Sequence, residues 1–174
     1  MTTIVYRDGI LAADTQLTHA KDIQTLEHKI HTLGKKHAYA ACGFLDDDLY
    51  FPKLVALVRA NPTGDANRAE REVKIQKLRK RLAKAFGAIE VKGRRAFWWD
   101  QSTGPNPIPT EGFYVVGSGE KYARAGLHLG LDARNAVLLA GELSKYTNTL
   151  VDSLDIYNGY VLSLVDFTKE HRLK

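Results

Sequence analysis

Short apolar runs separated by turn residues mark the start of the chain as β structure. Residues 3–7 are rich in β-branched and aromatic types, Asp8-Gly9 is a two-residue turn signal, and residues 10–13 form a second apolar run. This pattern predicts an antiparallel hairpin. Its first strand begins almost at the initiator Met, so we expect the start of the chain to lie inside the fold, where a terminus is usually loose.

Further along, apolar positions recur at helical spacing and predict two pairs of helices. In the first pair, Asp46-Asp47-Asp48 caps one helix, the stretch 61–64 breaks it, and a second helix starts near residue 65 or 67 with an apolar stripe that reaches Phe86. We expect these two helices to be antiparallel across a short loop. The second pair is predicted at 121–129 and, after a cap at Asp132, at 133 to about 146.

The remaining hydrophobic runs predict strands, and their order indicates the fold class. Strands are expected at 26–33, 37–43, 88–92, 94–99, 113–116 and 160–167, whereas 103–109 is expected to be a loop without helix or strand. Strands grouped in runs, rather than alternating with helices, argue against a doubly wound sheet. Two sheets covered by two helix pairs in one α+β domain, residues 1–174, is the economical solution.

Composition limits the class of protein. The 174 residues are 44% hydrophobic and 26% charged, as in an ordinary globular domain with a core. Cys42 is the single cysteine, so no internal disulfide can form, and we expect it to be a small core residue. With no apolar run of membrane-spanning length and no signal peptide, the chain is expected to be cytoplasmic.

The net charge of +5 permits nucleic-acid binding without requiring it. Much of the excess lies between Arg68 and Lys84, a segment with eight basic and two acidic residues. No aromatic residue alternates with the basic ones before Phe86, so a solvated helix face or a contact with a protein partner is the preferred interpretation.

The first residues also carry candidate chemistry. Removal of Met1 would leave Thr2 with a hydroxyl and a free α-amine on one residue, and an N-terminal threonine can act as nucleophile with its own amine as base. For Thr2 alone, an ordinary first strand is the better interpretation.

The motifs together resemble the proteasome β-subunits and HslV, a family of N-terminal-nucleophile hydrolases. The resemblance covers nearly the whole chain. It rests on the Thr-Thr-Ile-Val start, Leu11-Ala12-Ala13-Asp14, Lys29-Ile30, Gly43, Gly117-Ser118-Gly119 and the segment 140–148 ending in Tyr-Thr-Asn. It implies a four-layer αββα sandwich, with two antiparallel sheets between two helix layers.

The resemblance also implies residue roles. Thr2 would attack a peptide carbonyl, Lys29 would keep the α-amine neutral, and Asp14 would orient Lys29. Ser118 would assist the amine, and the Gly43 N–H would stabilise the oxyanion. Each residue alone has a simpler explanation: a solvated lysine, a strand-end aspartate, a turn glycine, or a phosphate-binding turn around Ser118.

Strand alternation extends the candidate site to a substrate pocket. If Lys29 points at Thr2, Glu27 and His31 leave the same face of the strand, and Ala41 shares the face of Gly43. Leu17 and Leu45 correspond to the family's pocket rim. One carboxylate in this pocket would favour a basic or polar substrate side chain, unless Lys29 neutralises Glu27 internally.

A cation is predicted where the helix at 133–146 ends. The carbonyls of Gly141, Ser144 and Thr147 follow one another at i, i+3 and i+6, and the corresponding turn in HslV-like proteins holds a cation. A water-filled turn is an equal alternative. Catalysis itself is expected to need no cofactor.

The sequence therefore predicts a threonine peptidase that assembles into homo-oligomeric rings, with an ATP-driven AAA+ unfoldase as a possible partner by resemblance. The alternative is a ring-forming scaffold of the same fold without peptidase activity. Ser144 stands where proteasome subunits carry a supporting aspartate, which weakens the predicted proton relay on that side.

Overall fold

The computed structural model describes residues 2–18, 24–43, 47–61, 63–84, 86–158 and 161–166. Its strands are β1 Thr3–Arg7, β2 Ile10–Asp14, β3 Gln16–Thr18, β4 Gln24–Leu26, β5 Ile30–Gly34, β6 His37–Cys42, β7 Gly87–Lys92, β8 Arg95–Asp100, β9 Asn106–Ile108, β10 Phe113–Gly117, β11 Leu150–Asp155 and β12 Val161–Asp166. Its helices are α1 Asp47–Arg59, α2 Asp65–Arg79, α3 Glu120–His128 and α4 Ala133–Leu143.

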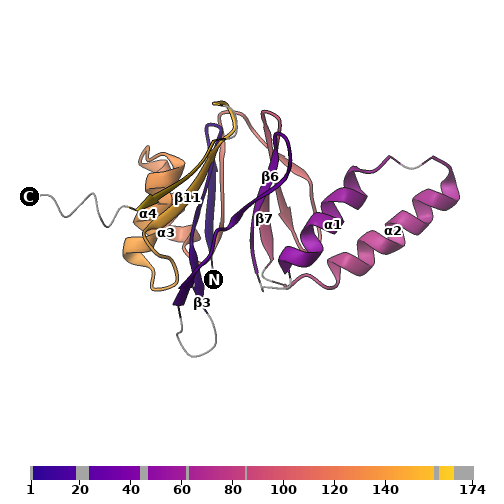
Figure 1. Ribbon diagram of the computed structural model, residues 1–174, viewed down its shortest axis with the longest axis horizontal. Coiled ribbons are helices and arrows are strands. Elements are labelled where there is room, and N and C mark those ends of the chain that lie inside the picture. The colour runs from indigo at the N-terminus through magenta and orange to yellow at the C-terminus, as the bar shows by residue number, and fades with distance from the viewer. Residues whose placement is uncertain are drawn as a thin grey trace, which may run out of the picture.

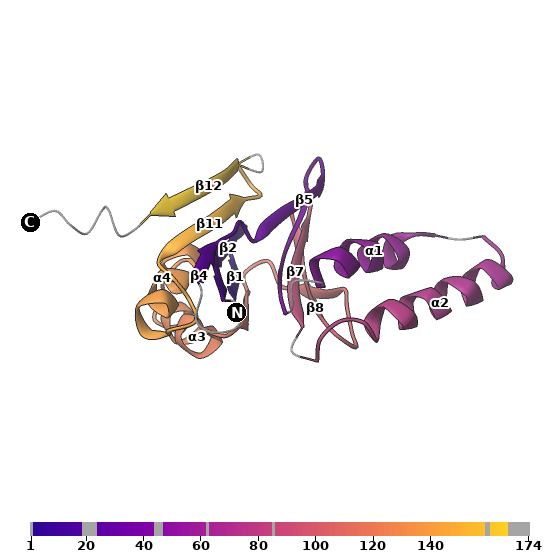
Figure 2. The same ribbon diagram turned by 60° about the horizontal axis from the view of Figure 1, so that its bottom comes forward.

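The strands form two five-stranded antiparallel sheets and one small ribbon. The first sheet has the order β10-β1-β2-β11-β12, the second has the order β5-β6-β7-β8-β9, and β3 pairs with β4. Helices α3 and α4 cover the outer face of the first sheet, while α1 and α2 lie beyond the second (Figures 1 and 2). This is the predicted αββα arrangement of two sheets between two helix layers.

The predicted first hairpin is confirmed in detail. Ile4 pairs with Ala13 and Arg7 with Ile10, so Asp8 and Gly9 form the two-residue connection. Both turn residues have positive φ, 50° and 81°, as a type I′ turn requires. Glycine avoids the steric cost of that conformation at the second position.

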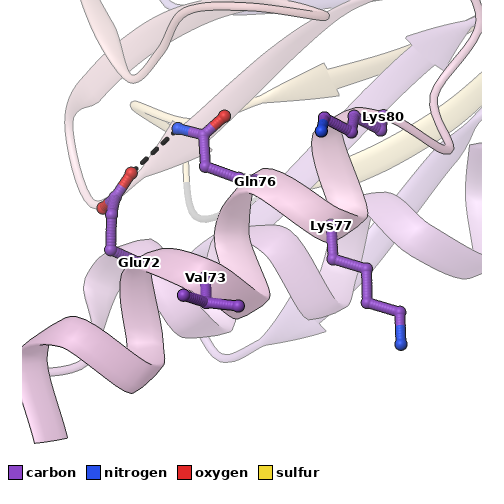
Figure 3. A pocket seen from close by; sticks show the side chains of 5 residues that line it. All are labelled: Glu72, Val73, Gln76, Lys77 and Lys80. Atoms are coloured by element: carbon purple, nitrogen blue, oxygen red, sulfur yellow. Dashed lines mark hydrogen bonds between the residues drawn. The ribbon is translucent and has the colours of Figure 1, made fainter.

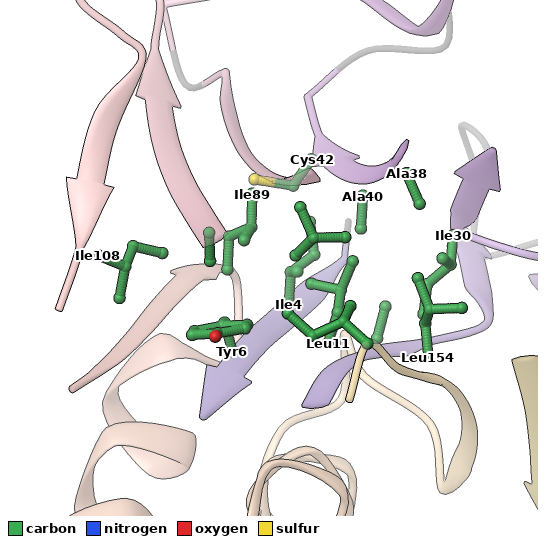
Figure 4. Packing of buried hydrophobic residues seen from close by; sticks show 14 residues of the cluster. Ile4, Tyr6, Leu11, Ile30, Ala38, Ala40, Cys42, Ile89, Ile108 and Leu154 are labelled. Carbon is green, nitrogen blue, oxygen red and sulfur yellow. The ribbon is translucent and has the colours of Figure 1, made fainter. Parts of the chain in front are cut away.

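The core has three layers of its own, because each sheet buries both faces. Side chains between the sheets include Ile4, Leu11, Ile89 and Leu154 (Figure 4). A second cluster joins the first sheet to α3 and α4, and a third joins the second sheet to α1 and α2. Helix α2 extends from the body with little buried surface, since Ile75 and Arg79 are its buried residues.

Three strands, β3, β9 and β11, were not predicted from the sequence, and of β4 only Leu26 was predicted. Strand β9 lies inside the segment 103–109 that was expected to be a loop, so that prediction is wrong. Its Pro107 is opposite Phe97 at the end of the sheet order, where a residue without an N–H is tolerated. Strand β11 was not predicted, because its buried Asp152 and Ser153 interrupt the apolar pattern.

Three predicted element ends also differ from the structure. Helix α4 ends at Leu143 rather than near Tyr146, and α2 ends at Arg79 although Leu82 and Phe86 stay buried beyond it. The strand expected at 26–33 is divided: Leu26 ends β4, residues 27–29 are irregular, and β5 starts at Ile30. No helix in the part of the chain that the structure describes is long and apolar enough to cross a membrane.

Candidate active site

Thr2 lies immediately before β1, and only 6% of its surface is exposed. Side chains alternate along a strand, and Ile4 and Tyr6 both point between the two sheets, so Thr2 shares that direction. Its carbonyl accepts a hydrogen bond from the Ser118 N–H at 3.0 Å. A Cβ at Gly117 would overlap the same carbonyl, and its φ of 110° also suits glycine. The Gly-Ser-Gly segment therefore holds the Thr2 main chain at close range.

Thr3 is held as firmly as its neighbour. Its N–H donates to Asp14 Oδ1 at 2.6 Å, and its hydroxyl accepts from the Gly119 N–H at 2.9 Å. The same hydroxyl forms a 2.7 Å hydrogen bond with the hydroxyl of Thr147. Because Thr3 is fully buried, these bonds link β1 to β2, to the start of α3 and to the turn after α4.

Asp14 is a buried carboxyl with unusual protonation. Its Oδ2 accepts from the Gln16 N–H at 3.1 Å, while Oδ1 serves Thr3. Burial raises the pKa of Asp14 to about 7, against the opposing effect of these two N–H groups and of the Lys29 charge. Asp14 therefore titrates near neutral pH and lies within electrostatic range of Lys29.

Lys29 is buried and lies immediately before β5, which is a strand of the second sheet. Its ammonium donates to Glu27 Oε2 at 2.8 Å, and its main-chain N–H donates to Asp152 Oδ2 at 3.1 Å. The sequence prediction was that Asp14 orients Lys29. Among the described residues the direct partner of the ammonium is Glu27, while the charge of Lys29 acts on Asp14 through space.

The predicted oxyanion glycine, Gly43, follows β6 and is exposed. A Cβ at this position would overlap the buried carboxylate of Asp47, the first residue of α1. Asp47 is tied down in turn, because its Oδ1 accepts from the Ala83 N–H at 3.1 Å. Gly43 is thus a position where the backbone must pass close to another group, and its role toward an oxyanion stays a prediction.

The Ser118 hydroxyl makes a long hydrogen bond, and the Cys42 thiol is buried in the core. The Ser118 hydroxyl donates to the carbonyl of Tyr146 at 3.4 Å, a long bond that leaves it weakly held. Burial raises the pKa of the Cys42 thiol to about 12, so this side chain is a neutral core residue.

Of the five predicted pocket residues, the structure describes the side chains of Glu27, His31 and Ala41. Glu27 pairs with Lys29, whereas His31 packs against the ring of Tyr39 at 5.2 Å between centroids, and Ala41 lies in the cluster that faces α1. Leu17 belongs to β3, but its side chain lies outside the described part of the chain, as does the whole of Leu45.

The predicted cation turn is well ordered by hydrogen bonds. The Ser144 carbonyl accepts from the Thr147 N–H at 3.2 Å, and a Cβ at Gly141 would overlap the carbonyl of Asn148. The described residues contain no cluster of three His, Cys, Asp or Glu side chains suited to a metal. A site made of carbonyls is a different chemistry, and it stays a prediction.

One contact of the site, that of Asp152 with Lys29, was missed by sequence reasoning. The pairing of Glu27 with Lys29 was considered as a complication, but the role of Asp152 was not foreseen because β11 was not predicted. Asp152 has apolar residues on both sides, Leu150 and Val151 before it and Leu154 after it, and an aspartate in such surroundings is a sequence signal that could have drawn attention to it.

Hollows on the surface of α2 lie apart from these residues. One, of about 350 Å³, is lined by Glu72, Val73, Gln76, Lys77 and Lys80 (Figure 3). A neighbouring one of about 260 Å³ is lined by Gln76, Arg79, Lys80, Gln101 and Ser102. Neither set includes a residue of the predicted active site.

Comparison with known proteins shows which fold this is. The sequence matches no protein-family model and no curated protein. The structure nevertheless matches solved structures over most of its length, and these define a proteasome/HslV-like fold.

One of these structures is eukaryotic HslV from Trypanosoma brucei, with a TM-score of 0.64 and 19% identity over 88% of this chain and 97% of that one. Another is BPH from Thiobacillus denitrificans, with a TM-score of 0.62 and 22% identity over 87% and 95% of the two chains. The same protein in complex with epoxomicin matches with a TM-score of 0.62 and 21% identity.

Proposed function

We propose that this chain is a threonine-type peptidase of the proteasome/HslV kind that acts after removal of Met1. The observation that carries the proposal is the buried Thr2 immediately before β1, whose main chain is held by Ser118 and whose neighbour Thr3 is held by Asp14. A nucleophile needs this kind of fixed position, because small displacements of a reacting group are costly. Lys29 supplies a buried positive charge from immediately before β5, a strand of the other sheet.

The chemistry follows from these positions. Removal of Met1 converts the Thr2 nitrogen from an amide to an amine, which can then accept the proton of the Thr2 hydroxyl. The hydroxyl oxygen attacks the peptide carbonyl, the C–N bond of the tetrahedral intermediate breaks, and the α-ammonium returns its proton to the leaving amine. Water then hydrolyses the ester of the acyl-enzyme, which releases the second product as an acid and restores the Thr2 hydroxyl. The charge of Lys29 favours the neutral, basic form of the amine, and Ser118 relays its proton.

Assembly and substrate choice belong to the same proposal. The likeness to HslV suggests that this chain forms homo-oligomeric rings with the active sites inside. An ATP-driven unfoldase would deliver substrate to these rings. Because Glu27 is paired with Lys29, its charge is already neutralised, and we expect at most a weak preference for basic side chains. Profiling a peptide library with wild type and Glu27→Gln tests this expectation. If both proteins prefer the same side chain at the residue before the cleaved bond, Glu27 does not select the substrate.

The alternative is a ring-forming scaffold without peptidase activity. It is favoured by the contact of Lys29 with Glu27, which turns the ammonium toward a carboxylate other than Asp14. In that case Met1 would be retained, or Thr2 would not react.

The deciding experiment combines intact mass, a covalent probe and turnover. We expect Met1 to be absent, epoxomicin to add to the peptide that begins with Thr2, and fluorogenic peptides to be hydrolysed. Thr2→Ala and Lys29→Ala should abolish hydrolysis and keep the oligomer, while the exposed-site controls Thr110→Ala and Lys53→Ala keep full activity. Complete retention of Met1 in an assembled preparation, or unchanged turnover by Thr2→Ala, would refute the proposal.

A further inference from the structure

Asp152 contacts the main chain of Lys29 from the opposite sheet. Its Oδ2 accepts the Lys29 N–H at 3.1 Å, and its two oxygens lie 2.9 and 3.0 Å from His28 Nδ1. Asp152 lies in β11 of the first sheet, and Lys29 lies immediately before β5 of the second. One carboxylate therefore joins the two sheets at the residue that carries the predicted catalytic ammonium.

The side chain of Asp152 points into the space between the sheets. Leu154 lies two residues after Asp152 and therefore on the same face of β11. Asp152 pairs with Ala13, and Leu154 pairs with Leu11. The three hydrophobic residues Ala13, Leu154 and Leu11 all belong to the cluster between the sheets. Only 1% of the Asp152 side chain is exposed, whereas 66% of the His28 side chain is exposed. Asp152 is thus the buried anchor of the contact, and the His28 ring covers it from outside.

This contact acts on a short stretch outside the strands, where the Thr15 carbonyl accepts the Glu27 N–H at 2.8 Å and Asp152 accepts the Lys29 N–H. Residues 27–29 are irregular and lie between the end of β4 and the start of β5. A buried carboxylate left without donors would be costly, so the Lys29 N–H and the His28 ring are held in place by the need to satisfy it.

We propose that Asp152 is a positioning residue for Lys29: its hydrogen bond to the Lys29 N–H sets where the ammonium lies relative to Thr2. The inference rests on the proposed peptidase function for its catalytic consequence. It does not rest on that function for the contact itself, which is a property of the fold.

The test uses Asp152→Ala, which removes the acceptor, and Asp152→Asn, which keeps one acceptor oxygen for the Lys29 N–H. Ser153→Ala is the matched control on the same strand, where the hydroxyl bonds to Arg134 at 2.7 Å instead. In Asp152→Ala, we expect kcat to fall by as much as about 100-fold, the scale of a small displacement near a reacting group, with KM nearly unchanged. Asp152→Asn should recover most of kcat.

A second readout follows Lys29 without turnover. Reductive methylation read by mass spectrometry should label Lys29 faster in Asp152→Ala than in wild type, with the exposed Lys53 as internal standard. In hydrogen exchange, the Lys29 amide should be protected in wild type and Asp152→Asn and unprotected in Asp152→Ala.

The outcomes separate the two proposals. If wild type hydrolyses no peptide, the proposed function fails, and labelling and exchange still decide the role of Asp152. Equal kcat and equal Lys29 labelling in Asp152→Ala and Ser153→Ala would overturn the positioning role, as would an Asp152→Asn variant as impaired as Asp152→Ala. Should Asp152→Ala fail to fold, an unprotected Lys29 amide in wild type would overturn it, and a protected amide in both wild type and Asp152→Asn would support it.

Discussion

The protonation of Asp14 should make the stability of this protein depend on pH in an unusual direction. Burial raises the pKa of this carboxyl from 3.8 to about 7. In the folded state it keeps its proton up to about pH 7, whereas in the unfolded chain it loses the proton near pH 4. The folded state binds more protons between these values, so the free energy of unfolding falls as the pH rises through them.

The replacement Asp14→Asn measures this contribution. A shift of about three pKa units corresponds to about 4 kcal/mol, and the neutral asparagine has no such dependence. Asparagine offers one acceptor oxygen to the Thr3 and Gln16 N–H groups, so the variant loses one hydrogen bond at every pH, at about 1–3 kcal/mol. Over the range from pH 5 to pH 8, Asp14→Asn should be least stable relative to wild type at pH 5, should gain steadily up to about pH 7 and should level off above it.

Urea unfolding of both proteins at pH 5, 6, 7 and 8 is the assay, at one fixed protomer concentration because assembly contributes to stability. Groups that do not interact with Asp14 affect both proteins equally and cancel in the difference between them. Intact mass must show the same N-terminus in both, since a free Thr2 amine would add a positive charge nearby. A difference in unfolding free energy that stays constant from pH 5 to pH 8 would refute the reasoning.

Three further outcomes are expected. Trp99→Phe should lower the unfolding free energy by about 1–3 kcal/mol, since the indole N–H donates to the fully buried Glu90 at 2.9 Å. Trp98→Phe should cost less, because the Trp98 indole makes no such bond to the residues that the structure describes and stacks on Tyr114 instead. Thr3→Val should destabilise by a similar amount of about 1–3 kcal/mol by leaving the Gly119 N–H and the Thr147 hydroxyl without their partner, and equal thermal midpoints for Thr3→Val and wild type would contradict this. If the turn after α4 binds a cation, the thermal unfolding midpoint should rise with one of sodium, potassium or magnesium at constant ionic strength. Electron density in the turn that makes only the bonds of a water molecule, in crystals grown at high cation concentration, would count against it.

Much of the architecture follows from local sequence pattern. The Asp8-Gly9 turn between two apolar runs leaves few alternatives to a hairpin, and the Asp132 cap is found as predicted, with its Oδ1 accepting the Asn135 N–H at 2.8 Å. The grouping of strands and helices was enough to predict two sheets and two helix layers. The predicted site residues stay predictions, although the structure shows how each described one is held.

The tertiary structure decided which segments that are distant in sequence contact one another. Strand β9 exists because β8 offers it an edge, and β11 is stable because partners in other elements satisfy its polar residues. The contact of Lys29 with Asp152 joins residues 123 positions apart, and the pKa of Asp14 depends on how completely neighbouring segments exclude water. Burial and long-range hydrogen bonds are properties of the packed chain, so residue type and spacing could identify the candidate groups but not the partners that set their chemistry.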